Sequence, residues 1–462
     1  MDKAKRIGDI PNVFQSRPLA REELDRFYFQ KTMPVRTGDL YDDPMDDIFN
    51  ICTGRANPDD PDRKPVLLVG NRGCGKSTEL NSLSDRLRKD GCRVHTVECR
   101  HDMDLGDPVY ADLLILIADA LTQIAGDVDC EPDPAALKIL RDFWMEEEET
   151  RTVKDESGFK AGAGFSLEPS VKMKGESGFE AGGMSSKLAL KVILKFFAEL
   201  RADYAKSDER RKFYREKVKR RLSEWMSAVN SIAESIAQTL NGKPPVIIFE
   251  DLDKLHSKEV WQVFYTDGVK LTGFHFPVIY TFPSAFALDD RYSDLEQDFE
   301  LIHFYMIQII DADNAPYEPG YEAIMEILRR RAELSLFEGG DQKNGVLRLL
   351  IEKTGGSLRD LFDVIYICFT RANRRDSPII QREDAEWAIE KKRKAFAAKV
   401  DSEHYAFLKK MYESREARQQ IQDRKLTMDL LDRRVILEHN GWRCVHPLIV
   451  DFLTEQGVID RG

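Results

Sequence analysis

The sequence predicts an α/β fold built on a parallel sheet, followed by a helical region and a small C-terminal module with two short strands. Three observations carry this prediction. Short apolar runs of strand length alternate with stretches of helical periodicity through residues 41–315. The apolar period is helical from residue 318 to about residue 400. Two β-rich runs then flank Asn440–Gly441, a dipeptide typical of tight hairpin turns.

Five runs are the predicted strands of the sheet. Most of them are apolar throughout, which is typical of parallel strands covered by helices on both faces. They span Pro65–Val69, Arg93–Glu98, Pro245–Phe249, Pro277–Phe282 and Phe304–Ile310.

The helices are predicted from apolar residues three or four positions apart. They span residues 42–52, 76–89, 108–124, 134–148, 187–241, 321–336, 345–354, 357–373 and 381–399. We therefore expect four parts: an N-terminal arm (1–40), an α/β core (41–315), a helical domain (316–400) and a C-terminal module (401–462). The strand pair after helices in the last part resembles the wing of a winged helix.

Two segments of the core stand out. Residues 156–162 recur almost unchanged as residues 176–182, with alternating apolar side chains around the first copy. We expect an inserted glycine-rich β-hairpin at 150–186, with a solvated loop as the alternative. The following helical segment, 187–241, has ten Lys/Arg and five Asp/Glu in residues 201–224. Such a charge excess fits a solvated face, or a contact with a phosphate backbone or an acidic partner.

Composition excludes several classes of protein. The 462 residues carry a formal net charge of −12, which argues against indiscriminate coating of nucleic acid. The sequence has no run of eighteen apolar residues, so we expect no transmembrane helix and no membrane partner. Seven single cysteines without a CxxC pair fit neither a disulfide framework nor a zinc site. A reducing cytoplasm is the expected compartment.

Gly70–Ser77 has the spacing GxxxxGK[ST] and lies between a predicted buried strand and a predicted amphipathic helix. In this context the motif is a phosphate-binding loop, or P-loop. Glycines let the backbone curl so that N–H groups point at a β-phosphate, and the helix N-terminus favours the same anion. Lys76 is expected to reach the β- and γ-phosphates, and the Ser77 hydroxyl to bind Mg²⁺. The expected nucleotide-binding residues are Gly70, Asn71, Arg72, Gly73, Cys74, Gly75, Lys76, Ser77 and Thr78.

Glu250 and Asp251 directly follow the third predicted strand, and Asp253 comes two residues later. A nucleoside triphosphatase needs a carboxylate beside the P-loop to orient Mg²⁺ and a second group to position the attacking water. Adjacent acids next to a buried strand are unfavourable unless a cation or hydrogen bonds balance them. We therefore predict that Glu250 and Asp251 are catalytic and metal-binding. The alternative is an acidic strand-to-helix turn with a capping aspartate.

With these motifs the chain resembles the AAA+ superfamily, most closely its origin-recognition-type and STAND (signal-transduction ATPase) members. Their second motif is four apolar residues, two acids, one residue and an Asp, and residues 246–253 are similar to it. The resemblance implies a P-loop (AAA+-like) sheet with a helical lid, and binding and hydrolysis of ATP with Mg²⁺. It places Glu250 on the metal side and Asp251 as the water-activating residue. The usual order, Asp then Glu, is exchanged here, so either acid can serve either role.

The resemblance assigns roles to three further residues. Thr281, in the fourth predicted strand, takes the place of sensor 1, which aligns water and γ-phosphate; the alternative is a strand residue bonded to a neighbour. Arg359, in the sequence 355–360, takes the place of the sensor 2 arginine that contacts the γ-phosphate; the alternative is a surface ion pair. Arg291 is a candidate finger toward the ATP of a neighbouring subunit.

These features together suggest an ATP-dependent switch. The resemblance implies a homo-oligomer that regulates a separate effector protein, as in bacterial antiviral defence or signalling. A DNA-binding loader, initiator or transposition regulator is the alternative. Residues 401–462 contain ten Lys/Arg and eleven Asp/Glu, which disfavours it, because a DNA-reading winged helix carries a basic face. An inactive nucleotide-binding scaffold is the third hypothesis, suggested by the exchanged acids.

Overall fold

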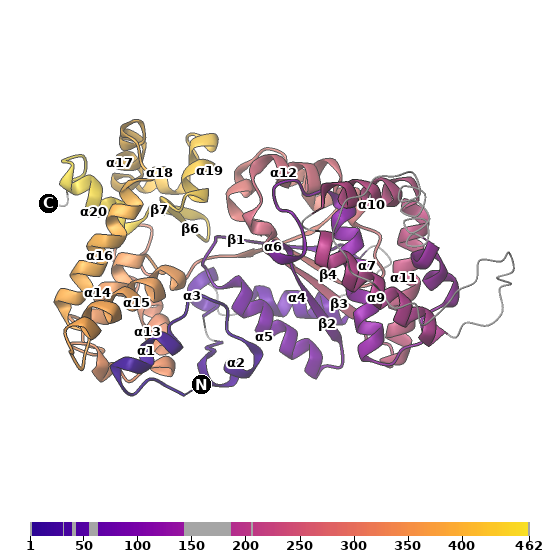
Figure 1. The fold of residues 1–462 in the computed structure, drawn as a ribbon. Helices are drawn as coiled ribbons and strands as arrows, with labels where there is room; N and C mark the ends of the chain where they lie inside the picture. Colours follow the sequence, from indigo (N-terminus) through magenta and orange to yellow (C-terminus); the bar gives the residue numbers. More distant parts are fainter. Residues whose placement is uncertain are drawn as a thin grey trace, which may run out of the picture.

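The computed structural model has a lobe built on a β-sheet and a mainly helical lobe, with the C-terminal module beside the latter (Figure 1). It describes residues 2–30, 32–38, 43–54, 63–142, 186–204 and 207–460, apart from the side chains of residues 202 and 203. The hairpin predicted at 150–186 falls outside these residues, except for its last position. Among the described helices, none is both long and apolar enough to cross a membrane.

A five-stranded parallel sheet forms the centre of the first lobe. The strand order is β2 (Arg93–Glu98), β3 (Pro245–Glu250), β4 (Val278–Pro283), β1 (Val66–Gly70) and β5 (Glu300–Phe304). Every pairing between neighbours is parallel, which confirms the predicted sheet. Because the carboxyl ends of parallel strands meet at one edge, the segments that follow β1, β3 and β4 converge there.

The position of the last strand corrects the prediction. Glu300–Phe304 pairs with β1, whereas the sequence predicts a strand over Phe304–Ile310. As an edge strand, β5 leaves Glu300 exposed, so it lacks the continuous apolar character of a central strand. Ile307 and Ile309 are fully buried, but they lie in the core of the helical lobe. The apolar run therefore marks the connection between the lobes.

Helices cover both faces of the sheet. Along β1, Leu67 and Val69 belong to one hydrophobic core, and Val66 and Leu68 belong to another. Burial on both sides explains why this strand is apolar at every position. The second core is formed with α4 (Pro44–Thr53) and α5 (Lys76–Lys89).

The first core is larger and contains α7 (Tyr110–Asp127). A short helix over residues 134–142 follows α7. The segment predicted to be helical over 187–241 forms three helices, α9 (Ser186–Tyr204), α10 (Asp208–Arg220) and α11 (Leu222–Thr239). They pack against α7, where Trp225 Nε1 donates to the Leu114 carbonyl at 3.1 Å. Two short helices, α6 (Cys99–Asp102) and α12 (Ser257–Trp261), follow β2 and β3.

The helical lobe contains α13 (Glu318–Arg331), α14 (Val346–Thr354), α15 (Leu358–Arg374) and α16 (Arg382–Ala397). The N-terminal segment packs on it through α1 (Ile10–Val13), α2 (Arg21–Phe27) and α3 (Pro34–Thr37). Ile10 and Phe14 are buried in the core of this lobe. Since α2 contacts both α5 and α13, the N-terminal segment bridges the two lobes.

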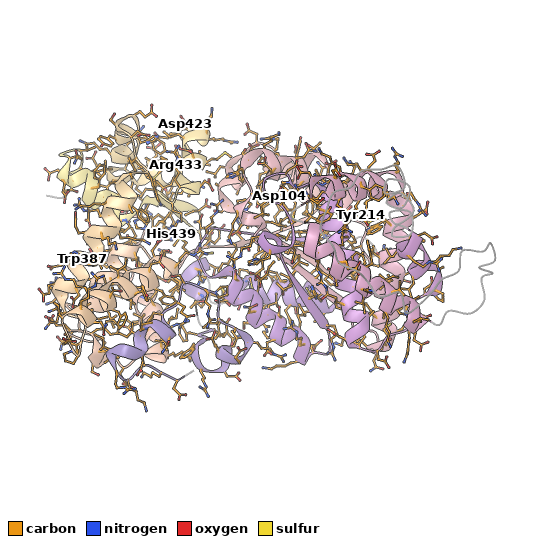
Figure 2. All side chains as sticks on the ribbon, in the orientation of Figure 1. Asp104, Tyr214, Trp387, Asp423, Arg433 and His439 are labelled. Carbon is orange, nitrogen blue, oxygen red and sulfur yellow. The ribbon has the colours of Figure 1, made fainter. Side chains whose placement is uncertain are left out.

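The C-terminal module is winged-helix-like, as the sequence predicts. It consists of α17 (Tyr405–Glu413), α18 (Arg415–Gln419), α19 (Arg424–Asp432), β6 (Ile436–His439), β7 (Trp442–Val445) and α20 (Pro447–Glu455). The antiparallel pair β6–β7 turns at Asn440–Gly441. His439, labelled in Figure 2, is buried with its ring centroid 4.4 Å from that of Trp442.

Candidate nucleotide-binding site

The predicted P-loop connects β1 to α5 at the carboxyl edge of the sheet. Gly73 and Gly75 have φ angles of +89° and +107°, which L side chains rarely adopt. Gly70 is required for a different reason, because a Cβ there would lie 2.6 Å from the Phe304 carbonyl oxygen of β5. The loop therefore has the glycine-dependent geometry that the spacing predicts.

Lys76 begins α5 and is only 5% exposed. Its Nζ donates to the Gly70 and Asn71 carbonyls at 2.6 and 3.0 Å, and lies 2.8 Å from Asp253 Oδ2. Burial alone would lower the pKa of Lys76, but the Asp253 carboxylate more than offsets this and raises it. Lys76 and Asp253 are therefore both charged. A bound phosphate would compete with the Asp253 carboxylate for the Lys76 ammonium group.

Ser77 and Glu250 are brought together from two elements, the first turn of α5 and the end of β3. Burial raises the pKa of Glu250 to about 7, and the nearby Ser77 hydroxyl opposes this shift. A carboxylate beside a hydroxyl is the oxygen donor set that Mg²⁺ prefers, so these residues fit the predicted metal.

Asp251 occupies a different environment. Its backbone is left-handed, with φ +71°, and its carboxylate pairs with Lys254 and, at 3.2 Å, with Arg100 Nε of α6. Two cations therefore pair with the Asp251 carboxylate, whereas the neighbour that lowers the pKa of Glu250 is the neutral hydroxyl of Ser77. The adjacent acids Glu250 and Asp251 therefore lie in different electrostatic environments.

The other P-loop residues lie around the same turn. Cys74 is buried in the core beneath the loop, and Thr78 Oγ1 accepts from the Leu19 N–H at 3.2 Å. Asn71 bonds Ser284, which follows β4. Arg72 Nε donates to the Asp253 carbonyl at 3.0 Å.

Thr281 does not line the cleft beside the P-loop. Its hydroxyl donates to the Phe249 carbonyl at 3.2 Å and accepts from the Leu252 N–H at 3.1 Å. Thr281 is 2% exposed and its hydroxyl binds the turn that carries the acids.

Arg359 comes from the N-terminal turn of α15, where Ser357 caps the helix. A Cβ added to Gly73 would lie 3.2 Å from Arg359 Cβ, so the lid helix touches the P-loop. Arg291, the candidate finger, forms two 2.8 Å contacts with Asp289 and lies over the Trp261 ring at 4.1 Å. The structure thus places Arg359 at the loop and engages Arg291 within its own chain.

One cleft of about 120 Å³ lies beside the P-loop, and Glu250 is not among the residues that line it. Lys76, Ser77, Asp251 and Arg359 line its polar part. The remaining walls include aromatic and apolar side chains from the N-terminal segment and the helical lobe, namely Phe27, Tyr28, Phe29, Ile327 and Phe362. This volume is smaller than the roughly 300–1,000 Å³ that is typical of ligand pockets.

Sequence reasoning missed three residues of this cleft. Arg36 is 2% exposed, donates to the Tyr305 carbonyl at 2.7 Å, and has Nη2 3.5 Å from the position of a Cβ on Gly75. Tyr28 donates to Glu79 at 2.5 Å, and burial raises the pKa of Glu79 to about 7. No motif marks these residues. The available signal was the apolar spacing of residues 24 and 27, which indicates a packed helix within the predicted arm.

No family model and no curated protein matches the chain. Similar solved structures include the ORC1 protein of Aeropyrum pernix in complex with DNA, with 12% identity and a TM-score of 0.34, covering 90% of this chain and 92% of that one. The ORC2 protein of Aeropyrum pernix (ADPNP–ADP complexes) has 9% identity and a TM-score of 0.33, with the same coverage. Cdc6p from Pyrobaculum aerophilum has 12% identity and a TM-score of 0.33, covering 89% and 92%. At these values the similarity does not define a family, and the function is argued from the site alone.

Proposed function

We propose that the chain is an ATP-binding and ATP-hydrolysing switch of the AAA+ type. The observation that carries this proposal is the convergence of three elements on one cleft. The P-loop supplies Lys76 and Ser77, the segment that follows β3 supplies Asp251, and the lid helix supplies Arg359, while Glu250 lies behind this lining, near Ser77.

Each of these groups has a role in phosphoryl transfer. The amides of residues 70–77 and the Lys76 ammonium bind the β- and γ-phosphates. Ser77 and Glu250 would hold Mg²⁺, which neutralises negative charge on the phosphates when bound. Asp251 orients the attacking water once Arg100 and Lys254 withdraw from its carboxylate. Arg359 contacts the γ-phosphate from the lid, and the aromatic walls of the cleft take the base.

Contacts beyond the cleft support a switch role. Arg72 of the P-loop lies 3.2 Å from Asp432 of the C-terminal module. Asp360, next to Arg359, lies 2.9 Å from Arg434 of the same module. The loop and the lid therefore contact one turn of the module. Asp253 thus contacts both Lys76, through its carboxylate, and Arg72, through its carbonyl, so a phosphate bound by Lys76 can be coupled to the module through this residue.

We further propose that the switch controls assembly into a homo-oligomer and binding to a separate effector protein. A bound γ-phosphate would favour one lobe arrangement, and that arrangement would present the module to another copy or to an effector chain. A switch of this kind needs only a difference in ligand contacts between its two states.

Phosphate release from Mg²⁺ and ATP tests the proposal. We expect turnover by the wild type and background release by Lys76→Ala. Lys89→Ala is the matched control, because Lys89 ends the same helix and its side chain is 68% exposed. Binding without turnover in the wild type would instead establish a nucleotide-binding scaffold. Equal release by the wild type and Lys76→Ala would contradict catalysis at this site.

A further inference from the structure

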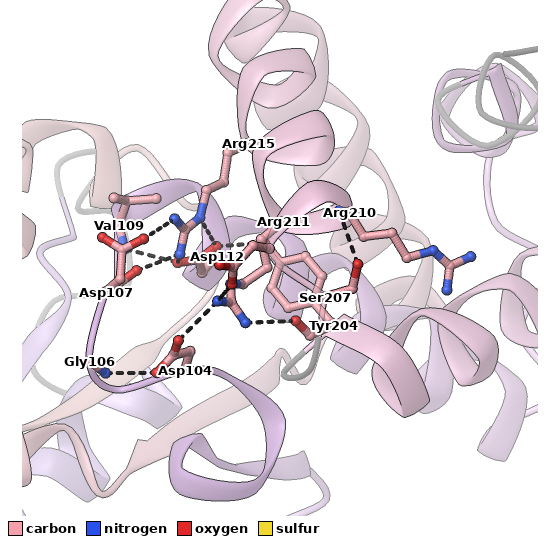
Figure 3. A network of polar contacts seen from close by, with 11 residues as sticks. Asp104, Gly106, Asp107, Val109, Asp112, Tyr204, Ser207, Arg210, Arg211 and Arg215 are labelled. Carbon is pink, nitrogen blue, oxygen red and sulfur yellow. Dashed lines mark hydrogen bonds and ion pairs between the residues drawn. The ribbon is translucent and has the colours of Figure 1, made fainter. Parts of the chain in front are cut away.

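The loop between β2 and α7 is connected to α10 by two ion pairs, in which the arginines are buried and the aspartates are exposed. Arg215 Nη1 lies 2.7 Å from Asp107 Oδ2, and Arg211 Nη2 lies 3.0 Å from Asp104 Oδ2. Both arginines point from α10 toward the loop, whereas Arg210 points away from it (Figure 3). The helix and the loop are more than 100 residues apart in the sequence, and these ion pairs connect them.

The network is closed by Asp112, in the first turn of α7 and 1% exposed. Its two oxygens accept from Arg215 Nε and Nη2, each at 2.8 Å, and one also accepts from the Tyr204 hydroxyl at 2.5 Å. Asp112 Oδ2 also accepts from the Val109 N–H at 2.9 Å, where the loop enters the helix. The Arg215–Asp112 ion pair is bidentate, so it fixes the orientation of the two side chains as well as the distance between them.

Burial makes these contacts specific. Arg211 and Arg215 are 6% and 7% exposed, so a displaced α10 would leave buried guanidinium groups without their partners. Asp104 and Asp107 are the exposed ends of the network, with side chains 38% and 69% exposed. The position of the loop is therefore linked to the position of α10.

The same loop reaches the candidate catalytic acid at its other end. Arg100 of α6 comes two residues after β2 and four residues before Asp104. Its Nε lies 3.2 Å from Asp251 Oδ2. A single short segment therefore contacts both the catalytic edge of the sheet and α10.

We propose that Arg211 and Arg215 are positioning residues that hold Arg100 against Asp251 and so restrain ATP hydrolysis. This inference rests on the proposed ATPase function and adds its regulation. A ligand or partner that shifts α10 would displace Asp104 and Asp107, move α6, and remove Arg100, one of the two cations that pair with the Asp251 carboxylate; Lys254 is the other. In this proposal the ligand or partner binds at α9 and α10, and α6 transmits the movement to the active site.

The test uses the exposed ends of the network, because their replacement leaves Asp112 and the buried arginines in place. The variant D104N/D107N should raise kcat for ATP by about two- to fivefold, the range expected when exposed ion pairs are removed, with KM unchanged. R100A should raise kcat by a similar factor, and Arg100→Lys should keep much of the restraint. D208N is the matched control, because it removes an exposed partner of Arg211 that belongs to α10 itself.

The variant that combines all three substitutions tests whether the network acts through Arg100. If the network acts through Arg100, D104N/D107N/R100A has the kcat of R100A alone, since the two changes share one pathway. Multiplied effects, or an unchanged kcat in D104N/D107N beside a raised one in R100A, would overturn the inference and leave the proposed function intact. Hydrogen exchange of the amides in residues 99–107 gives a readout without activity. Exchange should be faster in D104N/D107N than in D208N, and equal exchange would overturn the inference even if the wild type hydrolyses nothing.

Discussion

Replacing Asp253 by asparagine should tighten nucleotide binding while it destabilises the protein. The Asp253 carboxylate holds Lys76 Nζ at 2.8 Å, and their side chains are 11% and 5% exposed. A nucleotide needs this ammonium group for its phosphates, and Asp253 also repels them. Asp253→Asn removes the competitor and the repulsion but keeps the shape of the side chain.

Both effects can be estimated from the burial of the pair. Breaking a buried ion pair by removing one partner costs about 3–5 kcal/mol. Lys76 keeps two carbonyl acceptors, so we expect a loss of about 3 kcal/mol. With about 2–4 °C per kcal/mol, that loss lowers Tm by about 6–12 °C. Release of Lys76 from a charge of opposite sign should lower Kd for ATP by about tenfold, which corresponds to about 1.4 kcal/mol.

The measurements are thermal unfolding of the nucleotide-free protein and calorimetric titration with Mg²⁺ and ATP. Asp267→Asn is the matched control, because Asp267 is also a buried aspartate paired with a lysine, Lys270, but it does not line the cleft. The control should lower Tm without changing Kd. Weaker ATP binding by Asp253→Asn would refute the reasoning, because it would mean that Asp253 contributes to ligand binding.

The remaining predictions concern the acids and the lid. Asp251→Asn should bind ATP but slow phosphate release, while Glu250→Gln should weaken the dependence on Mg²⁺; normal release by Asp251→Asn with none by Glu250→Gln would reverse these roles. The raised pKa of Glu250 means that the folded protein keeps a proton that the unfolded chain loses, so its stabilising contribution disappears as pH rises from about 4.5 to about 7. Since Mg²⁺ needs the ionised form, its affinity should rise between pH 6 and pH 8 in the wild type and stay flat in Glu250→Gln. Asp360→Asn should lower stability by about 3 kcal/mol, because Lys392 and Arg434 lose a carboxylate that is 1% exposed, whereas Asp363→Asn, which removes a half-exposed partner of the same lysine, should cost less than about 1 kcal/mol. Equal losses in the two variants would contradict the burial argument.

The parts of the fold that local sequence determines were predictable. The glycine spacing of the P-loop and the continuous apolar character of β1 are local signals, and both agree with the structure. The edge strand β5 was misplaced because one of its faces is polar, while a neighbouring apolar run is buried by the other lobe. Long apolar periodicity predicted the helical lobe, since each helix buries one face.

The partners within the site could not be predicted in the same way. Arg36 reaches the P-loop from the N-terminal segment, and Arg100 reaches Asp251 from the end of β2. Such contacts depend on how distant segments pack, and a charged residue in a polar stretch has no periodicity that reveals its partner. The sequence also predicts Thr281 from its place in a strand, but the direction of a hydroxyl depends on the turn above it.

Calorimetric titration of the wild-type protein with ATP and Mg²⁺ tests the central claim most directly. We predict one saturable binding event per chain, lost in Lys76→Ala and retained in Lys89→Ala. No heat of binding in the wild type, or equal binding by Lys76→Ala, would contradict the assignment of this cleft as a nucleotide site.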